Sequence, residues 1–356
     1  MNKKKKILSD KILAVWMFVI GVHLFLYYLF HIGFHNQYPH TLGLIEPFPL
    51  LHGPLLFLYV HALIQPRPVF RKRDWLHAVP AIAYLLCMMP DMILLTGEEK
   101  LQFVFEQIPT DPPFYIILFD LLIDLSGVVY VISSLVLLRR HQKNIKDNFS
   151  DIEKINLKWL RALIVGMAGI WLTVLVTTTC GIASLPEAVA NADYIYVAVT
   201  IFIFLIGYFG FRQGAIFSDN TEETFPEPDS EKPKYVKSSL TSEKGQKYLK
   251  LLKALMTEEK PYLESKITLK QVSDMLDIHP NHLSQIINEY LNQSFYDMIN
   301  SYRVEEVKYR LKQEGSRKLT LLAHAYDSGF SSKSSFNEVF KKATGMTPST
   351  YQKQMN

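Results

Sequence analysis

The chain has 356 residues, of which 49 % are hydrophobic and 13 % aromatic, and it carries a formal net charge of +4. It is more apolar than an average soluble protein and long enough for two or three domains. The apolar residues are concentrated between residues 12 and 211, whereas amphipathic spacing returns from residue 212 onward. Cys87 and Cys180 both lie in apolar runs and indicate neither a disulfide framework nor a zinc site.

Six apolar stretches in the first 212 residues are close to the ~20 residues that a helix needs to cross a bilayer. The second is the shortest, and it becomes long enough if Leu42 to Pro47 contribute. We expect a bundle of about six transmembrane spans, at residues 12–34, 49–64, 75–96, 114–138, 159–182 and 194–211.

The segments that connect these spans alternate in charge. Fifteen basic residues lie before the first span, between the second and third, and between the fourth and fifth. The other three connections carry one basic residue in total, Lys100. The positive-inside rule therefore predicts that both chain termini lie in the cytoplasm.

Several histidines and aspartates fall within the spans, in their outer halves or near the middle. Ionisable side chains are costly in a membrane and by default mark a functional site. We expect an outward-opening pocket for a small ligand, a proton or a transition metal, and the alternative is interhelical hydrogen bonding that holds the bundle together. Apart from the one-turn spacing of the first two histidines there is no metal-ligand motif, so no metal or cofactor is expected. The candidate pocket residues are His31, His35, His52, Asp120 and Asp124.

Residues 213–240 are rich in Pro, Ser and acidic residues without periodicity, which predicts a linker. A short amphipathic helix is expected at residues 242–256. Thr268 and Gln271 then form a capping box that starts a helix, and Pro280 suits the first turn of the next one. Two short helices joined by a tight turn predict a helix-turn-helix. The outward residues of its second helix include Asn281, Ser284, Gln285 and Asn288.

The same pattern recurs further along the chain. The run LTLLAHAYDSG predicts a helix, Gly329 permits a left-handed turn, and SSKSSFNEVFKKAT predicts a second helix that Gly345 ends. Residues 295–313 predict a helix that connects the two units. The fold class is therefore all-α, with a transmembrane bundle followed by two helix-turn-helix units.

Residues 260–354 resemble the DNA-binding domain of the AraC/XylS transcription regulators. The stretch GFSSKSSFNEVFKKATGMTPSTY follows the order of that family: Gly-Phe, Ser-x-x-Phe, Phe-Lys-Lys and Gly-Met-Thr-Pro. The wider chain, with GYFGFRQ and PFPLLHGPLLFLYV, resembles the multi-span membrane branch of the family found in Bacteroidetes-type bacteria. Members of that branch often carry another span ahead of the first one seen here.

The resemblance implies that both recognition helices enter successive major grooves, about one helical turn (~34 Å) apart. Carried over position by position, it implies base contacts from Asn281, Ser284 and Gln285, with Asn288 near a phosphate. His324 and Ser328 stand where the family usually places aliphatic residues. In the second unit the implied contacts are Lys333, Ser334 and Asn337.

These patterns favour a one-component regulator with a membrane domain (1–212), a linker (213–240) and a DNA-binding domain (241–356). Its expected place is the bacterial cytoplasmic membrane, as a multi-pass protein whose DNA-binding domain is cytoplasmic. The expected partners are promoter DNA, RNA polymerase, the lipid bilayer, a second copy of the chain and an unknown signal molecule.

The alternative is an intramembrane enzyme or a transporter with a regulatory DNA-binding tail. The nearest match to a rhomboid-like Gly-x-Ser-Gly motif, Asp124-Leu125-Ser126-Gly127, lacks the first glycine. No internal repeat of the kind found in transporters is evident. We therefore expect no catalytic activity.

Overall fold

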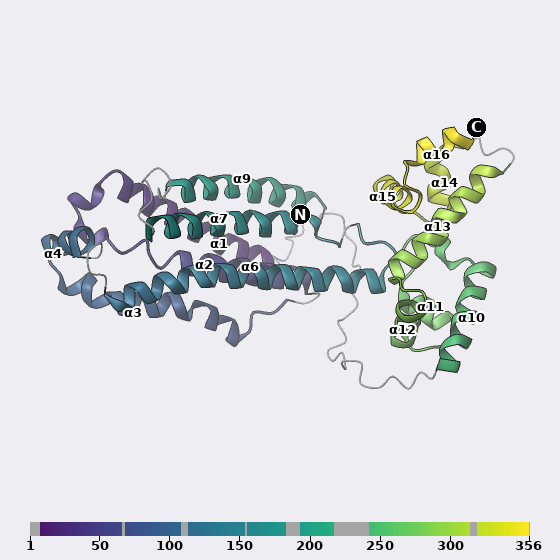
Figure 1. Ribbon diagram of the computed structural model, residues 1–356, viewed down its shortest axis with the longest axis horizontal. Helices are drawn as coiled ribbons and strands as arrows, with labels where there is room; N and C mark the ends of the chain where they lie inside the picture. The colour runs from purple at the N-terminus through teal and green to yellow at the C-terminus, as the bar shows by residue number, and fades with distance from the viewer. Residues whose placement is uncertain are drawn as a thin grey trace, which may run out of the picture. The chain divides into compact units, whose positions relative to one another are not determined.

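The chain divides into two compact units in the computed structural model (Figure 1). Unit 1 comprises residues 1–139 and 158–228, and unit 2 comprises residues 140–157 and 229–356. Within the described residues every regular element is a helix, as the sequence predicts. The structure describes residues 8–65, 68–107, 113–153, 155–182, 193–216, 242–313 and 319–355.

Unit 1 is built from long apolar helices, of which α1, α2, α6, α7 and α9 run along a common direction (Figure 1). The last residues of α6, from Arg140 on, belong to unit 2. In chain order the longer elements are α1 (Leu8–His31), α2 (Pro49–Ile64), η3 (Lys72–Ala78), α3 (Val79–Leu94), α4 (Gly97–Gln102), α6 (Phe114–Asn148), α7 (Lys158–Ile182) and α9 (Asp193–Ile216).

The second expected span has the predicted bounds as a helix, whereas the third is shorter than the sequence suggests. Helix α2 begins with Pro49 at its first turn, so Leu42 to Pro47 do not extend it. Helix α3 begins at Val79, after the 3-10 turn η3, because Pro80 again favours a helix start. The third helix therefore starts four residues after the predicted residue 75.

Trp16 is the side chain around which three helices of unit 1 meet. Its indole is fully buried, at 0 % exposure, and its ring lies 6.4 Å from Tyr59 of α2 and 5.9 Å from Phe202 of α9. Large rings at such distances bury much apolar area. The contact fixes α1 against α2 and α9.

Gly127 allows α6 to approach α7 closely. A Cβ at this position would lie 2.0 Å from the indole of Trp171, so only glycine leaves room for that ring. The glycine that ends the incomplete protease-like motif thus has a packing role in the structure.

The surface of unit 1 is strongly apolar. Phe18, Phe114 and Phe204 are all more than 70 % exposed, at 72 %, 77 % and 75 %. Among the described residues, three helices are long and apolar enough to cross a membrane: Leu8–His31, Phe114–Asn148 and Lys158–Thr179. Two more helices are apolar but shorter, Pro49–Ile64 and Tyr194–Gly207.

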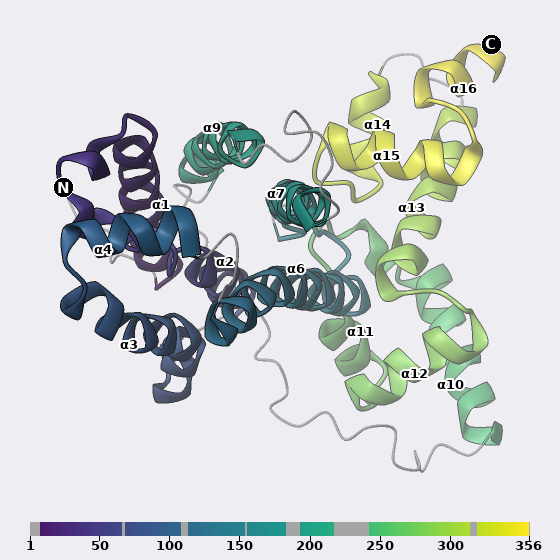
Figure 2. The ribbon, with the colours of Figure 1, turned by 60° about the vertical axis from the view of Figure 1, so that its left-hand side comes forward.

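Unit 2 contains the two predicted helix-turn-helix units and the helix between them (Figure 2). Most of the expected linker, residues 217–240, lies outside the described residues, and its first four residues continue α9. The helices are α10 (Ser242–Glu258), η5 (Pro261–Leu263), α11 (Leu269–Met275), α12 (Pro280–Tyr290), α13 (Phe295–Lys312), α14 (Leu321–Asp327), α15 (Lys333–Thr344) and α16 (Pro348–Met355).

The starts of these helices are set by capping side chains. The predicted box at α11 is confirmed, because Thr268 Oγ1 accepts from the Gln271 backbone N–H and the Gln271 side chain accepts from that of Thr268. His279 caps α12, where its Nδ1 accepts from the Asn281 N–H. Ser332 caps α15 in the same way, accepting from the Ser335 N–H.

Each helix-turn-helix has its own apolar core, and α13 contributes to both. The first core gathers side chains from α10, α11, α12 and the start of α13, including Phe295 and Met298. The second gathers Val304 and Val307 of α13 with side chains of α14 and α15. Because one straight helix serves two cores, it sets the relation between the two units.

Gly329 closes the turn between α14 and α15 in a way no other residue permits. Its φ is +92°, and a Cβ would lie 2.2 Å from the Tyr262 carbonyl oxygen and 2.9 Å from Arg303 Nε. Gly345, which ends α15, also has a positive φ of +79°, but a Cβ there meets nothing within 4 Å. A side chain at Gly345 would meet backbone strain alone, whereas one at Gly329 would meet both strain and steric overlap.

We predict that Gly329→Ala lowers the free energy of unfolding of residues 235–356 by about 2–5 kcal/mol, because strain and overpacking add. Gly345→Ala should cost only about 1–2 kcal/mol, the price of the left-handed conformation. Urea unfolding followed by circular dichroism measures both. Equal losses for the two variants would contradict the close approach described at Gly329.

Candidate functional site

Helix α12 presents part of the predicted DNA-facing set of the first unit. Asn281 is exposed at its start, and Ser284 and Asn288 are half-buried one turn apart. The Asn288 amide donates to the Ser284 carbonyl oxygen at 2.9 Å and to its hydroxyl at 3.3 Å. These residues lie on one face of the helix, as the sequence predicts.

Gln285 departs from the expected arrangement. The sequence places it on the outward face of α12, but its side chain is buried, with 8 % exposed. Its Nε2 donates to the Glu289 carboxylate at 2.9 Å, which holds the amide along the helix. The expectation that Gln285 points outward is therefore corrected.

Helix α15 presents the predicted residues of the second unit more openly. Lys333, Ser334 and Asn337 are all exposed, while Phe336 and Phe340 are buried beneath them. This alternation follows from the helical period, which puts residues three or four apart on one side. A cation, a hydroxyl and an amide thus line the exposed face of α15.

Arg303 of α13 joins separate parts of unit 2 through buried hydrogen bonds. The side chain is 1 % exposed. Its Nε donates to the Tyr262 carbonyl oxygen at 2.8 Å, and its Nη2 donates to those of Glu264 at 2.7 Å and Ser265 at 3.1 Å. The segment between η5 and α11 is therefore fixed to the connecting helix.

Burial lowers the pKa of Arg303 to about 10, because desolvation disfavours the cation, and Asp151 partly opposes that effect. The group therefore remains charged at neutral pH. Its carbon Cζ also lies 6.0 Å from the centre of the Phe330 ring, which directly follows Gly329. Arg303 thus touches both helix-turn-helix units.

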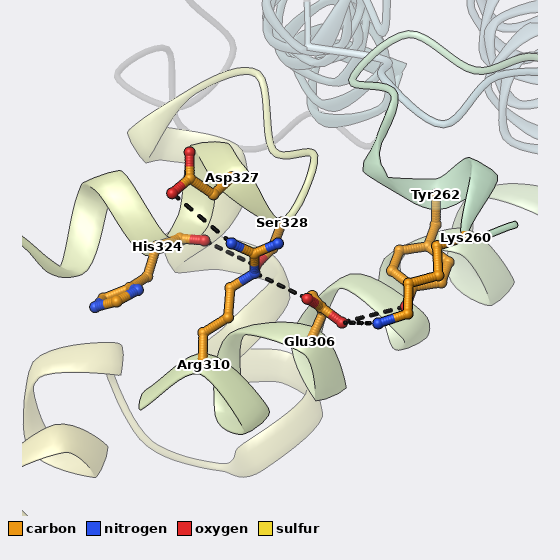
Figure 3. A network of polar contacts seen from close by, with 7 residues as sticks. All are labelled: Lys260, Tyr262, Glu306, Arg310, His324, Asp327 and Ser328. Atoms are coloured by element: carbon orange, nitrogen blue, oxygen red, sulfur yellow. Dashed lines mark hydrogen bonds and ion pairs between the residues drawn. The ribbon is translucent and has the colours of Figure 1, made fainter. Parts of the chain in front are cut away.

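A second polar network is centred on Glu306, one turn further along α13 (Figure 3). Its carboxylate accepts from Lys260 at 3.2 Å, from Tyr262 at 3.3 Å and from Arg310 at 2.9 Å. Arg310 also faces Asp327 of α14 at 3.8 Å. The network therefore connects η5 of the first unit to α14 of the second.

The pKa of Glu306 reflects these partners. Burial alone would raise it, but hydrogen bonds and positive charge from Lys260 and Arg310 outweigh burial and lower the pKa below its ordinary value. The carboxylate is only 7 % exposed, so it is screened little by salt. The ionised form is what holds the network together.

His324 and Ser328 fill positions where the resemblance leads one to expect aliphatic residues. Both are buried, at 4 % and 0 % exposure. The Ser328 hydroxyl donates to the His324 carbonyl oxygen at 2.7 Å, which satisfies the polar group inside the core (Figure 3). The Ser328 hydroxyl is thus accommodated at the end of α14.

Unit 1 contains a cavity of about 330 Å³ between α1, α3, α4, α6, the turn after α4 and the segment before α2. Its wall is mainly apolar and includes four ionisable side chains: Glu46, Asp91, Lys100 and Asp120. Of the predicted pocket residues, Asp120 lines this cavity. The other four, His31, His35, His52 and Asp124, do not.

The predicted histidines lie in different surroundings. His52 is paired with His23, whose Nδ1 lies 2.9 Å from His52 Nε2. His35 lies between the rings of Phe30 and Phe105, at 5.0 and 5.3 Å. His31 is exposed at the end of α1. No group of three His, Cys, Asp or Glu residues suited to a metal ion occurs in the part of unit 1 or unit 2 that the structure describes.

Sequence reasoning missed the central part played by Arg303 and the cavity residues Glu46 and Lys100. Glu46 and Lys100 lie in connections outside the expected spans, so hydropathy does not draw attention to them. Arg303 stands in a helix rich in charged residues, where nothing local shows that it is buried. The only sign of its burial is that Arg303 lies at helical spacing from the buried apolar residues of α13.

Comparison with known proteins supports the assignment of unit 2. Residues 272–354 match the family model described as a helix-turn-helix domain. The chain is 32 % identical over 90 residues to a protein of Bacillus subtilis (strain 168) described as an uncharacterized HTH-type transcriptional regulator, YobQ. That match covers 25 % of this chain and 36 % of the relative. No solved structure matches the chain significantly.

We predict a pH-dependent loss of stability in Glu306→Gln. At pH 7 the variant of residues 235–356 should lose about 1.5–3 kcal/mol, the range for hydrogen bonds to charged groups. Because the folded-state pKa is lowered, the stabilisation is complete above the unfolded pKa of about 4.3. It disappears as the pH falls through the lower folded pKa, so the two proteins should converge in acid.

The control is Glu305→Gln, which removes an exposed carboxylate one residue away that is paired with Lys308. Exposed pairs contribute about 0–1 kcal/mol, so this variant should differ little from the parent at any pH. Urea unfolding between neutral and acid pH gives the comparison. A Glu306→Gln difference that stays constant with pH would refute the electrostatic origin.

Proposed function

We propose that this protein is a membrane-anchored, one-component transcription regulator. Unit 2 binds double-stranded promoter DNA through α12 and α15, and unit 1 crosses the membrane and receives a signal. The observation that carries the proposal is the pair of helix-turn-helix units built on one continuous helix, α13 (Phe295–Lys312). Two recognition helices held by one rigid element suit two successive major grooves.

The exposed chemistry of α15 fits base recognition. An amide such as Asn337 reads adenine bidentately, and a lysine such as Lys333 reads the acceptors of guanine. In the first unit the proposed base contacts are Asn281 and Ser284, with Asn288 near a phosphate. Gln285 reaches a base only after its hydrogen bond to Glu289 breaks.

Charge supports the same use of unit 2. Residues 240–356 hold 17 Lys and Arg against 13 Asp and Glu, which accounts for the whole net charge of +4. Lys333 and Lys341 of α15 are exposed. A basic surplus on the recognition face favours the phosphate backbone in a salt-dependent way.

The exposed apolar side chains of unit 1 support its place in a bilayer. Water would disfavour a surface on which several phenylalanines are more than 70 % exposed, whereas lipid would solvate it. We propose that all six predicted spans cross, with both termini in the cytoplasm of a bacterial cell. The short helices α2 and α3 then cross together with their flanking turns.

The cavity of unit 1 is the proposed place for the signal. A volume of about 330 Å³ is at the lower end of small-molecule sites, and a mostly apolar wall with a few polar groups is typical of them. The wall holds three carboxyl groups, of Glu46, Asp91 and Asp120, against the one ammonium group of Lys100, and this excess would favour a cationic group. RNA polymerase and a second copy of the chain complete the proposed partners.

We predict that residues 235–356 prefer DNA from upstream of the protein's own gene over scrambled DNA. The double variant Lys333→Ala, Asn337→Ala should reduce that preference about tenfold or more, because each good base contact contributes ~1–3 kcal/mol. Its remaining binding should be weak and strongly salt-dependent. Titrations across a salt series measure both quantities.

The matched control is Gln246→Ala, Lys253→Ala, which removes an amide and a cation from exposed positions of α10. Its preference for the promoter should stay within about twofold of the parent, since phosphate-level effects do not discriminate sequence. Equal binding of both DNAs by the parent fragment would count against the proposal.

The topology makes a separate prediction. Alkaline phosphatase, which is active only outside the cytoplasm, should be active when fused in the connection after α4 and inactive when fused after residue 356. The reason is the positive-inside rule, applied to the alternating basic connections. Activity at the C-terminal fusion would place the DNA-binding unit on the wrong side of the membrane.

A further inference from the structure

The segment between α6 and α7 lies against the DNA-binding domain. By its contacts, residues 140–157 belong to unit 2 although they are far from the rest of it in sequence. Phe149 pairs with Thr268 as an isolated antiparallel bridge, and the Ser150 N–H donates to the Ile267 carbonyl oxygen at 3.3 Å. The segment Phe149–Glu153, here called the α6–α7 latch, therefore binds next to the start of α11.

Ser150 is the buried centre of this contact, with 1 % of its surface exposed. Its carbonyl oxygen accepts from Asn300 Nδ2 at 3.3 Å and from Arg303 Nη1 at 3.3 Å. Its hydroxyl accepts from Arg303 Nη2 at 3.2 Å. The latch thus uses the same buried guanidinium that holds the segment before α11.

Glu153 brings a carboxylate to the second recognition helix. It accepts a hydrogen bond from the hydroxyl of Ser332, the residue that caps α15. Lys333, Ser334 and Asn337 follow directly on the same helix. The carboxylate therefore lies at the end of α15 from which the proposed DNA-reading face begins.

A carboxylate and a DNA phosphate compete for such a position. Both are stabilised by the partial positive charge at a helix N-terminus and by its N–H groups. The latch also carries Asp151, so its two acidic side chains repel the DNA backbone over roughly a Debye length, about 8–10 Å. A recognition helix enters the major groove by its N-terminal residues, which are those beside Glu153.

We propose that the α6–α7 latch is an intramolecular inhibitor that occupies the phosphate position at the N-terminus of α15. In the latched state α15 does not engage DNA fully, and release of the latch frees it. The inference rests on the proposed function, because it assigns the regulation of the same DNA-binding unit.

The place of the latch in the chain gives release a mechanical cause. It follows α6 directly and is followed by α7, which begins at Lys158. Both helices are long and apolar enough to cross a membrane. A shift of either helix is transmitted along the backbone to Ser150 and Glu153 without a further messenger.

The test uses the full chain in membranes. Cys87 and Cys180 are first replaced by Ser, and Phe149→Cys and Thr268→Cys are then added. Residues paired across an antiparallel bridge have Cα atoms about 4.5–5.5 Å apart, within the range of a disulfide. Oxidation should therefore close a bond that locks the latch, and a reductant should reopen it.

We expect the oxidised protein to bind promoter DNA at least tenfold more weakly than the same protein after reduction. Equal or tighter binding in the oxidised state overturns inhibition, and failure to form the bond overturns docking of the latch. If the reduced protein shows no preference for the promoter, the proposed function itself fails, while the yield of the bond still decides docking.

A charge variant tests the role of Glu153 without altering the fold. Glu153→Gln in the otherwise unchanged chain should bind promoter DNA about fivefold more tightly, and the gain should shrink as salt is raised. Glu258→Gln makes the same change of charge at an exposed position of α10 and should change affinity less than twofold. A gain that is equal in both variants would assign the effect to net charge and overturn the latch.

Discussion

The buried guanidinium of Arg303 is the interaction on which unit 2 depends. Removing a cation from water costs several kcal/mol, and the cost is offset only when its donors are well satisfied. Here six hydrogen bonds go to the backbone and side chains of Ser150, Tyr262, Glu264, Ser265 and Asn300. Because most acceptors are carbonyl oxygens, the group fixes backbone positions and not merely side chains.

This arrangement explains several features that look separate. Gly329 must lack a side chain because its backbone lies against Arg303 and the Tyr262 carbonyl. Glu306, one turn along α13, adds a second link, because its carboxylate forms ion pairs with both Lys260 and Arg310. Both helix-turn-helix units are thereby fixed to one helix, α13. The proposed binding of two successive grooves requires such a fixed spacing. The α6–α7 latch reaches the same guanidinium, so the proposed regulation acts at the joint between the units.

The sequence predicts the local structure of unit 2 well, because the signals are local. The capping box at Thr268 and Gln271, the proline at the start of α12 and the glycine that ends α15 each act within one turn of helix. The docking of Ser150 on Arg303 depends instead on a residue 153 positions away. No periodicity encodes such contacts.

Unit 1 shows the same division between local signals and long-range contacts. Hydropathy places the six helices, but α3 begins four residues later than expected, at Val79. The cavity gathers Glu46 and Lys100 from connections that hydropathy passes over. Asp120 and Asp124 lie one turn apart on nearly the same face of α6, so they differ mainly by a rise of ~6 Å along the helix axis. The cavity reaches Asp120 but not the level of Asp124, and hydropathy does not show where along a helix a cavity ends.

The most direct test of the account is a footprint of the full chain on its promoter, with base-specific methylation interference on both strands. Two recognition helices fixed to α13 should give two protected major-groove patches on one face of the DNA, about 10 base pairs apart. When base pairs are inserted between the two sites, the protein should not follow the moved site. One patch should be lost, because the distance between the two recognition helices is fixed. A single patch on the native site, or two patches whose spacing follows the insertion, would contradict a rigid two-unit reader.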